Sequence, residues 1–186
     1  MRLPSLTSGT FFLGFRLIVD SATCEVKVGL SKRTKKRLNE KVKRLTPRNA
    51  GRSLGDGIKK INSYLKGWFE YFKLLTDDLR VLESTDAHIR RRLRATLLKQ
   101  WKQKRVRMHK LIDYGVSQRA AGNAVYGQSR SLWALSAHNT IHRALPNRFF
   151  KELGLFSLKE EKSRLDVTEI DVASVQIGGE VPKSRQ

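Results

Sequence analysis

Residues 86–107 read DAHIRRRLRATLLKQWKQKRVR, and they carry the strongest pattern in the chain. Apolar residues recur there every four positions, which predicts a helix with one buried stripe and with Thr85 or Asp86 as its N-cap. The stripe consists of Ile89, Leu93, Leu97 and Trp101. Residues 90–110 contain ten Lys or Arg and no Asp or Glu. A helix that buries one face and carries cations elsewhere requires a large anionic partner, and nucleic acid is the simplest candidate.

The composition of the whole chain points the same way. Among 186 residues there are 38 Lys or Arg and 17 Asp or Glu, which gives a net charge of +21. Such a charge repels itself in a compact protein, and binding to phosphates would neutralise it and release counterions. The hydrophobic share of 39% is sufficient for a modest core in one domain or two small ones.

Cysteine and apolar content argue against other classes. The single cysteine, Cys24, excludes an internal disulfide and a cysteine-based zinc site. No apolar run approaches the ~18 residues of a membrane span. We expect a protein of the cytoplasm (bacterial type) or of an organellar matrix, not secreted, without a cofactor and without a membrane partner.

The first third of the chain predicts two strands and a basic helix. Residues 11–20 and 25–29 have strand-like composition, so residues 1–30 are interpreted as a β-hairpin. Ser31 then caps a helix that ends near Pro47. At about 100° per residue, three of its arginines form a cationic ridge away from the apolar stripe. They are Arg33, Arg37 and Arg44.

The remaining chain is expected to be helical up to residue 158. Ser53 opens an amphipathic helix whose aromatic residues should build the core rather than stack on bases. Short helices follow the basic helix of residues 86–107. From residue 159 to 186, five basic residues oppose six acidic ones without any aromatic residue, which predicts a disordered tail.

Six stretches, in this order, resemble a known family. They are FFLGFRL, LSKRTKKRLNEKVKRLT, INSYLKGWFEYF, IRRRLRATLLKQWK, LIDYGVS and ALPNRFFKELGLFSL. Together they cover roughly residues 11–158. The chain resembles the carboxy-terminal part of group II intron-encoded reverse transcriptase/maturases, which are proteins of mobile elements.

The resemblance implies a division of the chain. Residues 1–30 are similar to the end of the polymerase palm, residues 31–80 to the helical thumb, and residues 81–158 to the maturase domain, or domain X. The expected fold is mainly α, with a short N-terminal β-hairpin, a helical thumb-like bundle and a second small helical module. In that family, thumb and domain X grip the intron RNA, and the RNA performs the splicing chemistry.

The same resemblance argues against catalysis by this chain alone. Family polymerases carry a Tyr/Phe-x-Asp-Asp motif whose carboxylates hold metal ions, and about ten residues precede FFLGF where that motif should lie. Asp77 and Asp78 follow no strand–turn–strand pattern and are interpreted as acids near a helix start. His138 and His142 have helical i, i+4 spacing but no third metal ligand nearby. We expect no catalytic residue and no metal site.

A helical wheel divides the cations of residues 86–107. Arg90 and Arg94 border the apolar stripe and are expected to be structural, whereas Arg91, Arg92, Lys99 and Lys102 are expected to face phosphate. The predicted RNA-binding residues are Arg33, Arg37, Lys41, Arg44, Arg48, Arg91, Arg92, Lys99, Lys102 and Arg105. The predicted structural residues are Arg90, Arg94, Leu65, Trp68, Phe72 and Trp101.

The sequence therefore predicts a maturase-type protein that binds structured group II intron RNA and assists its splicing. Three alternatives remain open. The chain could be a fragment of a reverse transcriptase (an RNA-directed DNA polymerase) that needs a separately encoded palm and fingers polypeptide. It could be a DNA-binding module built on the short helices of residues 109–143. It could also be a non-functional, truncated relic of a mobile element.

Overall fold

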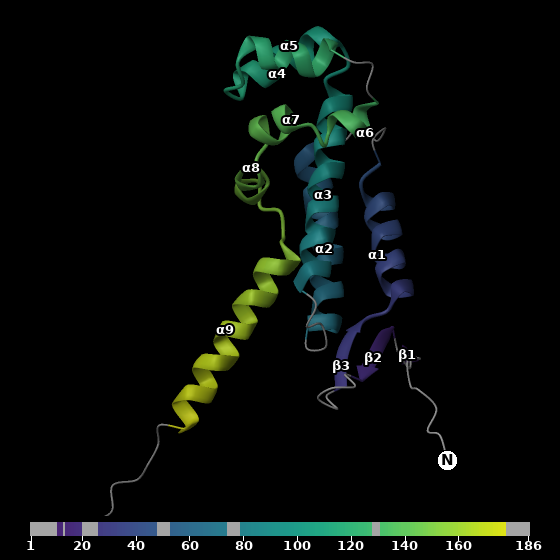
Figure 1. Ribbon diagram of the computed structural model, residues 1–186, viewed down its shortest axis with the longest axis vertical. Coiled ribbons are helices and arrows are strands. Elements are labelled where there is room, and N and C mark those ends of the chain that lie inside the picture. Colours follow the sequence, from purple (N-terminus) through teal and green to yellow (C-terminus); the bar gives the residue numbers. More distant parts are fainter. Residues whose placement is uncertain are drawn as a thin grey trace, which may run out of the picture.

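The computed structural model describes residues 11–12, 14–19, 26–47, 53–73, 79–127 and 131–177 (Figure 1). Within these ranges the chain forms three strands and nine helices, so the predicted mainly α class is confirmed. The strands are β1 (Phe11–Phe12), β2 (Phe15–Val19) and β3 (Val26–Leu30). The helices are α1 (Lys32–Leu45), α2 (Leu54–Phe72), α3 (Leu79–Gln100), α4 (Lys104–Asp113), α5 (Gln118–Tyr126), α6 (Leu132–Leu135), α7 (Asn139–Ala144), α8 (Asn147–Glu152) and α9 (Leu158–Ile177).

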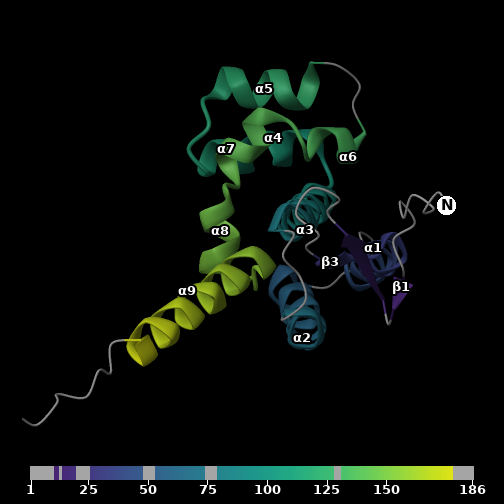
Figure 2. The same cartoon turned by 60° about the horizontal axis from the view of Figure 1, so that its bottom comes forward.

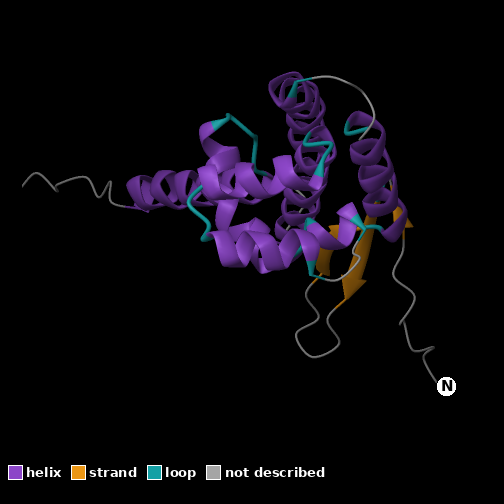
Figure 3. Cartoon of the chain, turned by 90° about the horizontal axis from the view of Figure 1, so that it is seen from above, coloured by secondary structure: helices purple, strands orange, loops and turns teal. Residues whose placement is uncertain are grey.

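The strands form a small antiparallel sheet of order β1-β2-β3, which lies to one side of the helices (Figure 3). The pairing of β2 with β3 runs from Phe15 opposite Leu30 to Val19 opposite Val26. The turn of the predicted hairpin falls at residues outside the described ranges. The sheet therefore lies directly before α1, which begins two residues after β3 ends.

Gly14, between β1 and β2, is hydrogen-bonded to the start of α1 through its carbonyl. Its φ is +94°, a left-handed conformation that glycine adopts without strain. The Gly14 carbonyl accepts hydrogen bonds from the Ser31 amide at 3.0 Å and from the Thr34 hydroxyl at 2.6 Å. Ser31 caps α1, as predicted, because its Oγ accepts a hydrogen bond from the Thr34 amide at 3.1 Å. These bonds hold the first turn of α1 against the strands.

Helix α3 is the central element of the fold. Helices α1, α2, α6 and α9 all contact it, and Figure 2 shows α1, α2 and α6 arranged around it. Its 22 residues correspond to a length of about 33 Å. Helices α4 and α5 pack on each other beyond its C-terminal end (Figure 1). Segments that are far apart in sequence thus hold fixed positions along one long helix.

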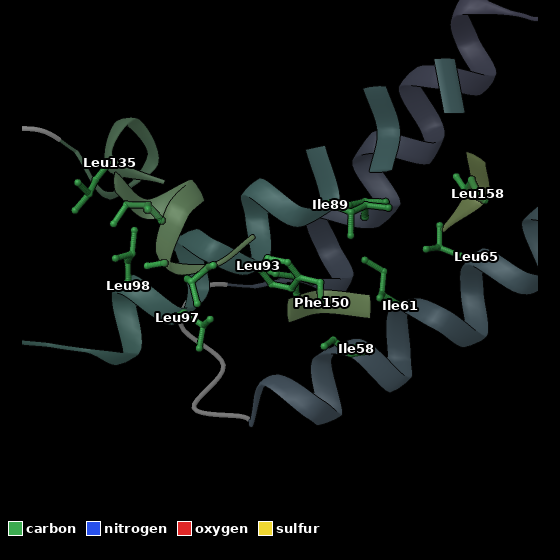
Figure 4. Close-up of a cluster of buried hydrophobic side chains, with 14 of the residues drawn as sticks. Ile58, Ile61, Leu65, Ile89, Leu93, Leu97, Leu98, Leu135, Phe150 and Leu158 are labelled. Carbon is green, nitrogen blue, oxygen red and sulfur yellow. The ribbon is translucent and has the colours of Figure 1, made fainter. Parts of the chain in front are cut away.

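One apolar core runs along α2 and α3. Ile61 and Leu65 of α2 and Ile89 and Leu93 of α3 are buried. Phe150 of α8 lies among side chains of these two helices (Figure 4). Burying side chains of this size contributes about 1.5–3 kcal/mol each. The apolar residues that α2 and α3 share with α8 therefore stabilise the packing of these helices.

The four apolar residues predicted to be structural all lie in or against this core. Leu65 and Trp68 are buried, and Phe72 and Trp101 are half-buried. The rings of Trp68 and Phe72 stack with centroids 4.6 Å apart. Phe72 also meets the Phe15 ring of β2 at 5.2 Å. The aromatic residues of α2 therefore connect the sheet to the helical core.

Asp86 of α3 anchors the N-terminus of α9. Its carboxylate accepts hydrogen bonds from the Ser157 hydroxyl at 2.7 Å and from the backbone amides of Leu158 and Lys159 at 3.1 Å each. Burial raises the pKa of the Asp86 carboxyl, and the hydrogen bonds and the charge of Arg90 oppose that rise. A buried acid on one helix thus caps another helix that lies 72 residues later in the chain.

This contact corrects two expectations. Helix α3 begins at Leu79, so Thr85 and Asp86 lie inside it and do not cap it. The expected disordered tail is wrong for residues 159–177, which belong to α9, while residues 178–186 lie outside the described ranges. The start of α9 has a local cap in Ser157, whose Oγ accepts a hydrogen bond from the Glu160 amide at 3.3 Å, and Asp86 adds a second acceptor from α3. None of the helices in the described ranges combines the length and the apolar character that a membrane span requires.

Candidate nucleic-acid interface

Helix α1 presents a row of exposed cations. Its buried face consists of Thr34, Leu38 and Val42, which pack toward α2 and α3. The opposite side is exposed at the three residues predicted as a ridge, which are Arg33, Arg37 and Arg44. The last turn of α1 is basic, which favours the helix dipole, whereas its first turn contains cations and no acid, which does not. The predicted ridge is thus available to a polyanion.

Of the two other residues predicted on this surface, only Lys41 is described, and its side chain turns away from the ridge. Lys41 is half-buried, and its ammonium lies 5.6 Å from the centroid of the Tyr64 ring of α2. This cation–π contact draws the Lys41 side chain toward α2. Arg48 lies outside the described residues.

Arg94 of α3 has the structural position that its place on the helical wheel predicts. It is only 2% exposed, and its Nε donates a hydrogen bond to the Leu145 carbonyl at 2.9 Å. A second guanidinium nitrogen donates to Asn147 Oδ1 at 3.3 Å. Burial, and then the charge of Arg90, lower the pKa of Arg94 to about 10. Arg90 itself is half-buried, and its charge acts on Asp86. Arg94 therefore connects α3 to the segment around the start of α8.

Arg91 and Arg92 are oriented differently from the prediction. The Arg91 guanidinium lies 4.1 Å above the centroid of the Trp133 ring and donates a hydrogen bond to the Trp133 carbonyl at 3.1 Å. Arg92 donates to the Thr46 hydroxyl at 2.5 Å and to the carbonyls of Thr46 and Lys43 at 2.8 Å and 3.2 Å. A helical wheel describes one helix only, and here α1 and α6 pack on the side expected to face solvent. Contact of Arg91 and Arg92 with RNA stays a prediction.

A second exposed cationic group lies where α3 passes into α4. Lys99, Lys102 and Arg105 are exposed, as predicted for RNA contacts. Arg107 shapes this turn, because it donates hydrogen bonds to the carbonyls of Leu98 and Lys102 at 2.9 Å each. The cations at the end of α3 are therefore presented by an ordered turn.

A groove of about 670 Å³ between α1, α3 and α6 was not predicted. It is lined by Lys36, Asn39, Glu40, Lys43, His88, Arg92 and Trp133. Of these residues, only Arg92 is among the predicted RNA contacts. The seven-residue spacing of Lys36 and Lys43 is visible in the sequence. Their approach to Trp133 is not, because it depends on how α6 folds back against α3.

We expect His88 to make the protein less stable in mild acid. Burial, and then the charges of Arg92 and Arg91, lower the pKa of His88 below its ordinary value of 6.5. The unfolded chain, with the ordinary pKa, takes up the proton first as the pH falls. The contribution of His88 is therefore present above about pH 6.5 and is lost as the pH falls through its folded-state pKa.

Thermal unfolding at several pH values tests this assignment. The Tm of the wild-type protein should fall more between pH 7 and pH 5.5 than the Tm of a His88→Gln variant. Equal falls in the two proteins would contradict the role given to His88.

One of the two histidines considered for metal binding has a structural role. His138 caps α7, because its Nδ1 accepts a hydrogen bond from the Thr140 amide at 3.3 Å. Across the described ranges, His, Cys, Asp and Glu side chains form no group of three that could hold a metal ion.

These features define a class: a mainly helical, strongly basic protein that presents cations on α1 and at the end of α3 over one apolar core. Residues 35–115 match the family model described as the group II intron, maturase-specific domain. The match confirms the resemblance seen in the sequence for residues 35–115, which are similar to the maturase-specific domain. A search of curated proteins found no match. The matched segment extends from α1 to the end of α4 and crosses residue 80, where the sequence analysis places a boundary between two modules.

Proposed function

We propose that this chain binds folded group II intron RNA and assists its splicing, while the RNA performs the chemistry. The observation that carries the proposal is the exposed arginine ridge of α1, most of which lies inside the maturase-specific match. Such a ridge suits phosphates better than a protein surface, because the helix that carries it has eight Lys or Arg and one acid.

The mechanism follows from how the helices are fixed. Arg92 bonds the end of α1 to α3, and Arg94 bonds α3 to Leu145 and Asn147. The exposed cations of α1 and of the α3 end thus keep a constant separation. Rigidly spaced cations select an RNA by the arrangement of its phosphates rather than by its base sequence. The proposed contacts are Arg33, Arg37, Arg44, Lys99, Lys102 and Arg105.

The division of the chain is part of this proposal. Residues 31–80 act as thumb-like helices and residues 81–158 as the domain X-like module, and both contribute cations to one RNA surface. Residues 1–30 correspond to the end of a palm, so a separately encoded palm and fingers polypeptide is a further possible partner.

Salt dependence tests the electrostatic basis of binding. If six phosphates are engaged, the logarithm of the affinity for intron RNA should fall against the logarithm of salt concentration with a slope of roughly 4 to 5. Filter binding of the full chain at several salt concentrations measures this slope. A slope near zero would refute the proposal, and so would duplex DNA that competes as well as the intron RNA.

Splicing itself provides the functional readout. A group II intron transcript at low magnesium concentration should splice faster with the chain than without it. Splicing that is unchanged while RNA binding persists would limit the function to binding.

A further inference from the structure

The groove between α1, α3 and α6 has the size and lining of a site for a single nucleotide. Its volume of about 670 Å³ falls within the range of small-ligand pockets. It combines cations, hydrogen-bonding groups and one aromatic ring from three helices. The ridge residues Arg33 and Arg37 are not among its lining, so the groove is a distinct part of the basic surface.

Trp133 provides an aromatic wall that is held in place. Its side chain is half-buried and lines the groove. The Arg91 guanidinium covers the ring at 4.1 Å, and the His88 ring meets it edge-on at 5.9 Å. The Trp133 carbonyl accepts hydrogen bonds from Arg91 at 3.1 Å and from the Ser136 hydroxyl at 2.7 Å. A fixed aromatic ring beside a cationic surface is the usual platform for an unpaired base.

Two lysines place positive charge along one side of the groove. Lys36 and Lys43 lie on α1 seven residues apart, which corresponds to a rise of about 10.5 Å along the helix. Both side chains are exposed, and within the described ranges neither ammonium forms an ion pair. Arg92 is committed to the carbonyls at the end of α1, so it sets the separation of α1 and α3. The two lysines are therefore the cations that can meet phosphates here.

The groove also contains groups that can hydrogen-bond a base. The Asn39 amide offers both donors and an acceptor. His88 is held neutral near pH 7, and a neutral imidazole has one donor and one acceptor. The single acid, Glu40, adds acceptors that can pair with exocyclic amino groups. This set matches the mixed donor and acceptor edge of a nucleobase.

We propose that the groove holds one unpaired nucleotide of the bound RNA, with its base against Trp133 and its phosphates at Lys36 and Lys43. The inference rests on the proposed function, since it assumes that RNA is the partner. It adds that the protein distinguishes unpaired from paired RNA at this place. A base in a continuous duplex is stacked and cannot enter the groove, whereas a bulged nucleotide can.

The test compares two labelled RNA hairpins with the full chain, by fluorescence anisotropy at constant salt. One hairpin has a fully paired stem, and the other has the same stem with three unpaired nucleotides in a bulge. The wild-type protein should bind the bulged RNA about tenfold more tightly, which corresponds to about 1.4 kcal/mol. Trp133→Leu should abolish this preference, and Trp133→Phe, which retains an aromatic ring, should keep most of it.

Matched variants on α1 distinguish the contribution of the groove to RNA binding from that of the ridge. Lys36→Ala with Lys43→Ala should weaken the bulged RNA more than the paired RNA, so the preference should fall severalfold. Arg33→Ala with Arg37→Ala should weaken both RNAs by the same factor and leave the preference intact. Thermal unfolding establishes whether each variant is folded. If Trp133→Leu does not fold, the double lysine variant still tests the site.

The outcomes distinguish the two proposals. Equal affinity of the wild-type protein for both RNAs would overturn the nucleotide site, while salt-dependent binding of the paired RNA would still support the proposed function. A preference that survives in Trp133→Leu would also overturn the site. Failure to bind either hairpin would overturn the nucleotide site, and the binding of the intron RNA, measured separately, would decide the proposed function.

Discussion

Replacing Asp86 by alanine should lower the free energy of unfolding by about 3 kcal/mol. Three donors lose their acceptor in this variant, namely the Ser157 hydroxyl and the amides of Leu158 and Lys159. The loss of an N-cap costs about 0.5–2 kcal/mol, and a buried donor left without a partner costs about 1–3 kcal/mol. The sum exceeds the effect of an ordinary surface substitution, because α9 would lose its attachment to α3.

Urea unfolding measures this change, and a neighbouring acid provides the control. Glu83 also lies on α3 and also contacts the start of α9, through an exposed ion pair with Lys159 at 2.9 Å. Glu83→Ala removes the same charge but should cost less than about 1 kcal/mol, since exposed pairs contribute little. A similar loss in both variants would mean that charge, rather than capping by Asp86, is responsible.

Asp86→Asn tests whether the carbonyl oxygen alone can hold α9. Asparagine keeps a carbonyl oxygen and is itself a good N-cap, so the stability should lie between that of the wild type and that of Asp86→Ala. Hydrogen exchange of the first amides of α9 should follow the same order. Unchanged protection of these amides in Asp86→Ala would show that α9 is held by other contacts.

Periodicity predicted the core well. The stripe of Ile89, Leu93 and Leu97 is buried along α3, because a residue that recurs every four positions stays on one face of a helix. The caps Ser31 and Ser53 were likewise recognised, since each bonds a backbone amide three residues ahead. Both signals are local, and local signals are contained in a short stretch of sequence.

The candidate nucleic-acid interface was predicted less completely than the core, for a physical reason. An arginine can reach phosphate, a carbonyl or an aromatic face, and the choice depends on what lies next to it. Arg91 meets Trp133 and Arg92 meets Thr46, and each partner is more than 40 residues away in the chain. The exposed ridge of α1 was predicted because no element packs over Arg33 and Arg37. Helix α9 was missed although Ser157 is a local cap, whose Oγ accepts a hydrogen bond from the Glu160 amide at 3.3 Å, because the mixed charges of residues 159–186 were given more weight.

Reversing the charge of the α1 ridge should reduce the affinity for intron RNA by about a thousandfold at near-physiological salt. The variant is Arg33→Glu, Arg37→Glu and Arg44→Glu, and all three side chains are exposed. Each substitution removes one phosphate contact and introduces repulsion, so about tenfold per residue is a reasonable expectation. The salt slope should also decrease by roughly 2 to 3, because three contacts no longer release counterions.

A triple variant on α2 controls for net charge. Lys59, Lys60 and Lys66 are also exposed, and replacing all three by glutamate changes the charge by the same amount. These lysines lie outside the proposed contacts, so they act on the RNA only through a field that salt screens within about 10 Å. The α2 variant should therefore lose less than about tenfold in affinity and keep its salt slope. Equal losses in the two variants would mean that the chain attracts RNA by total charge alone, and that the position of the ridge on α1 has no special role.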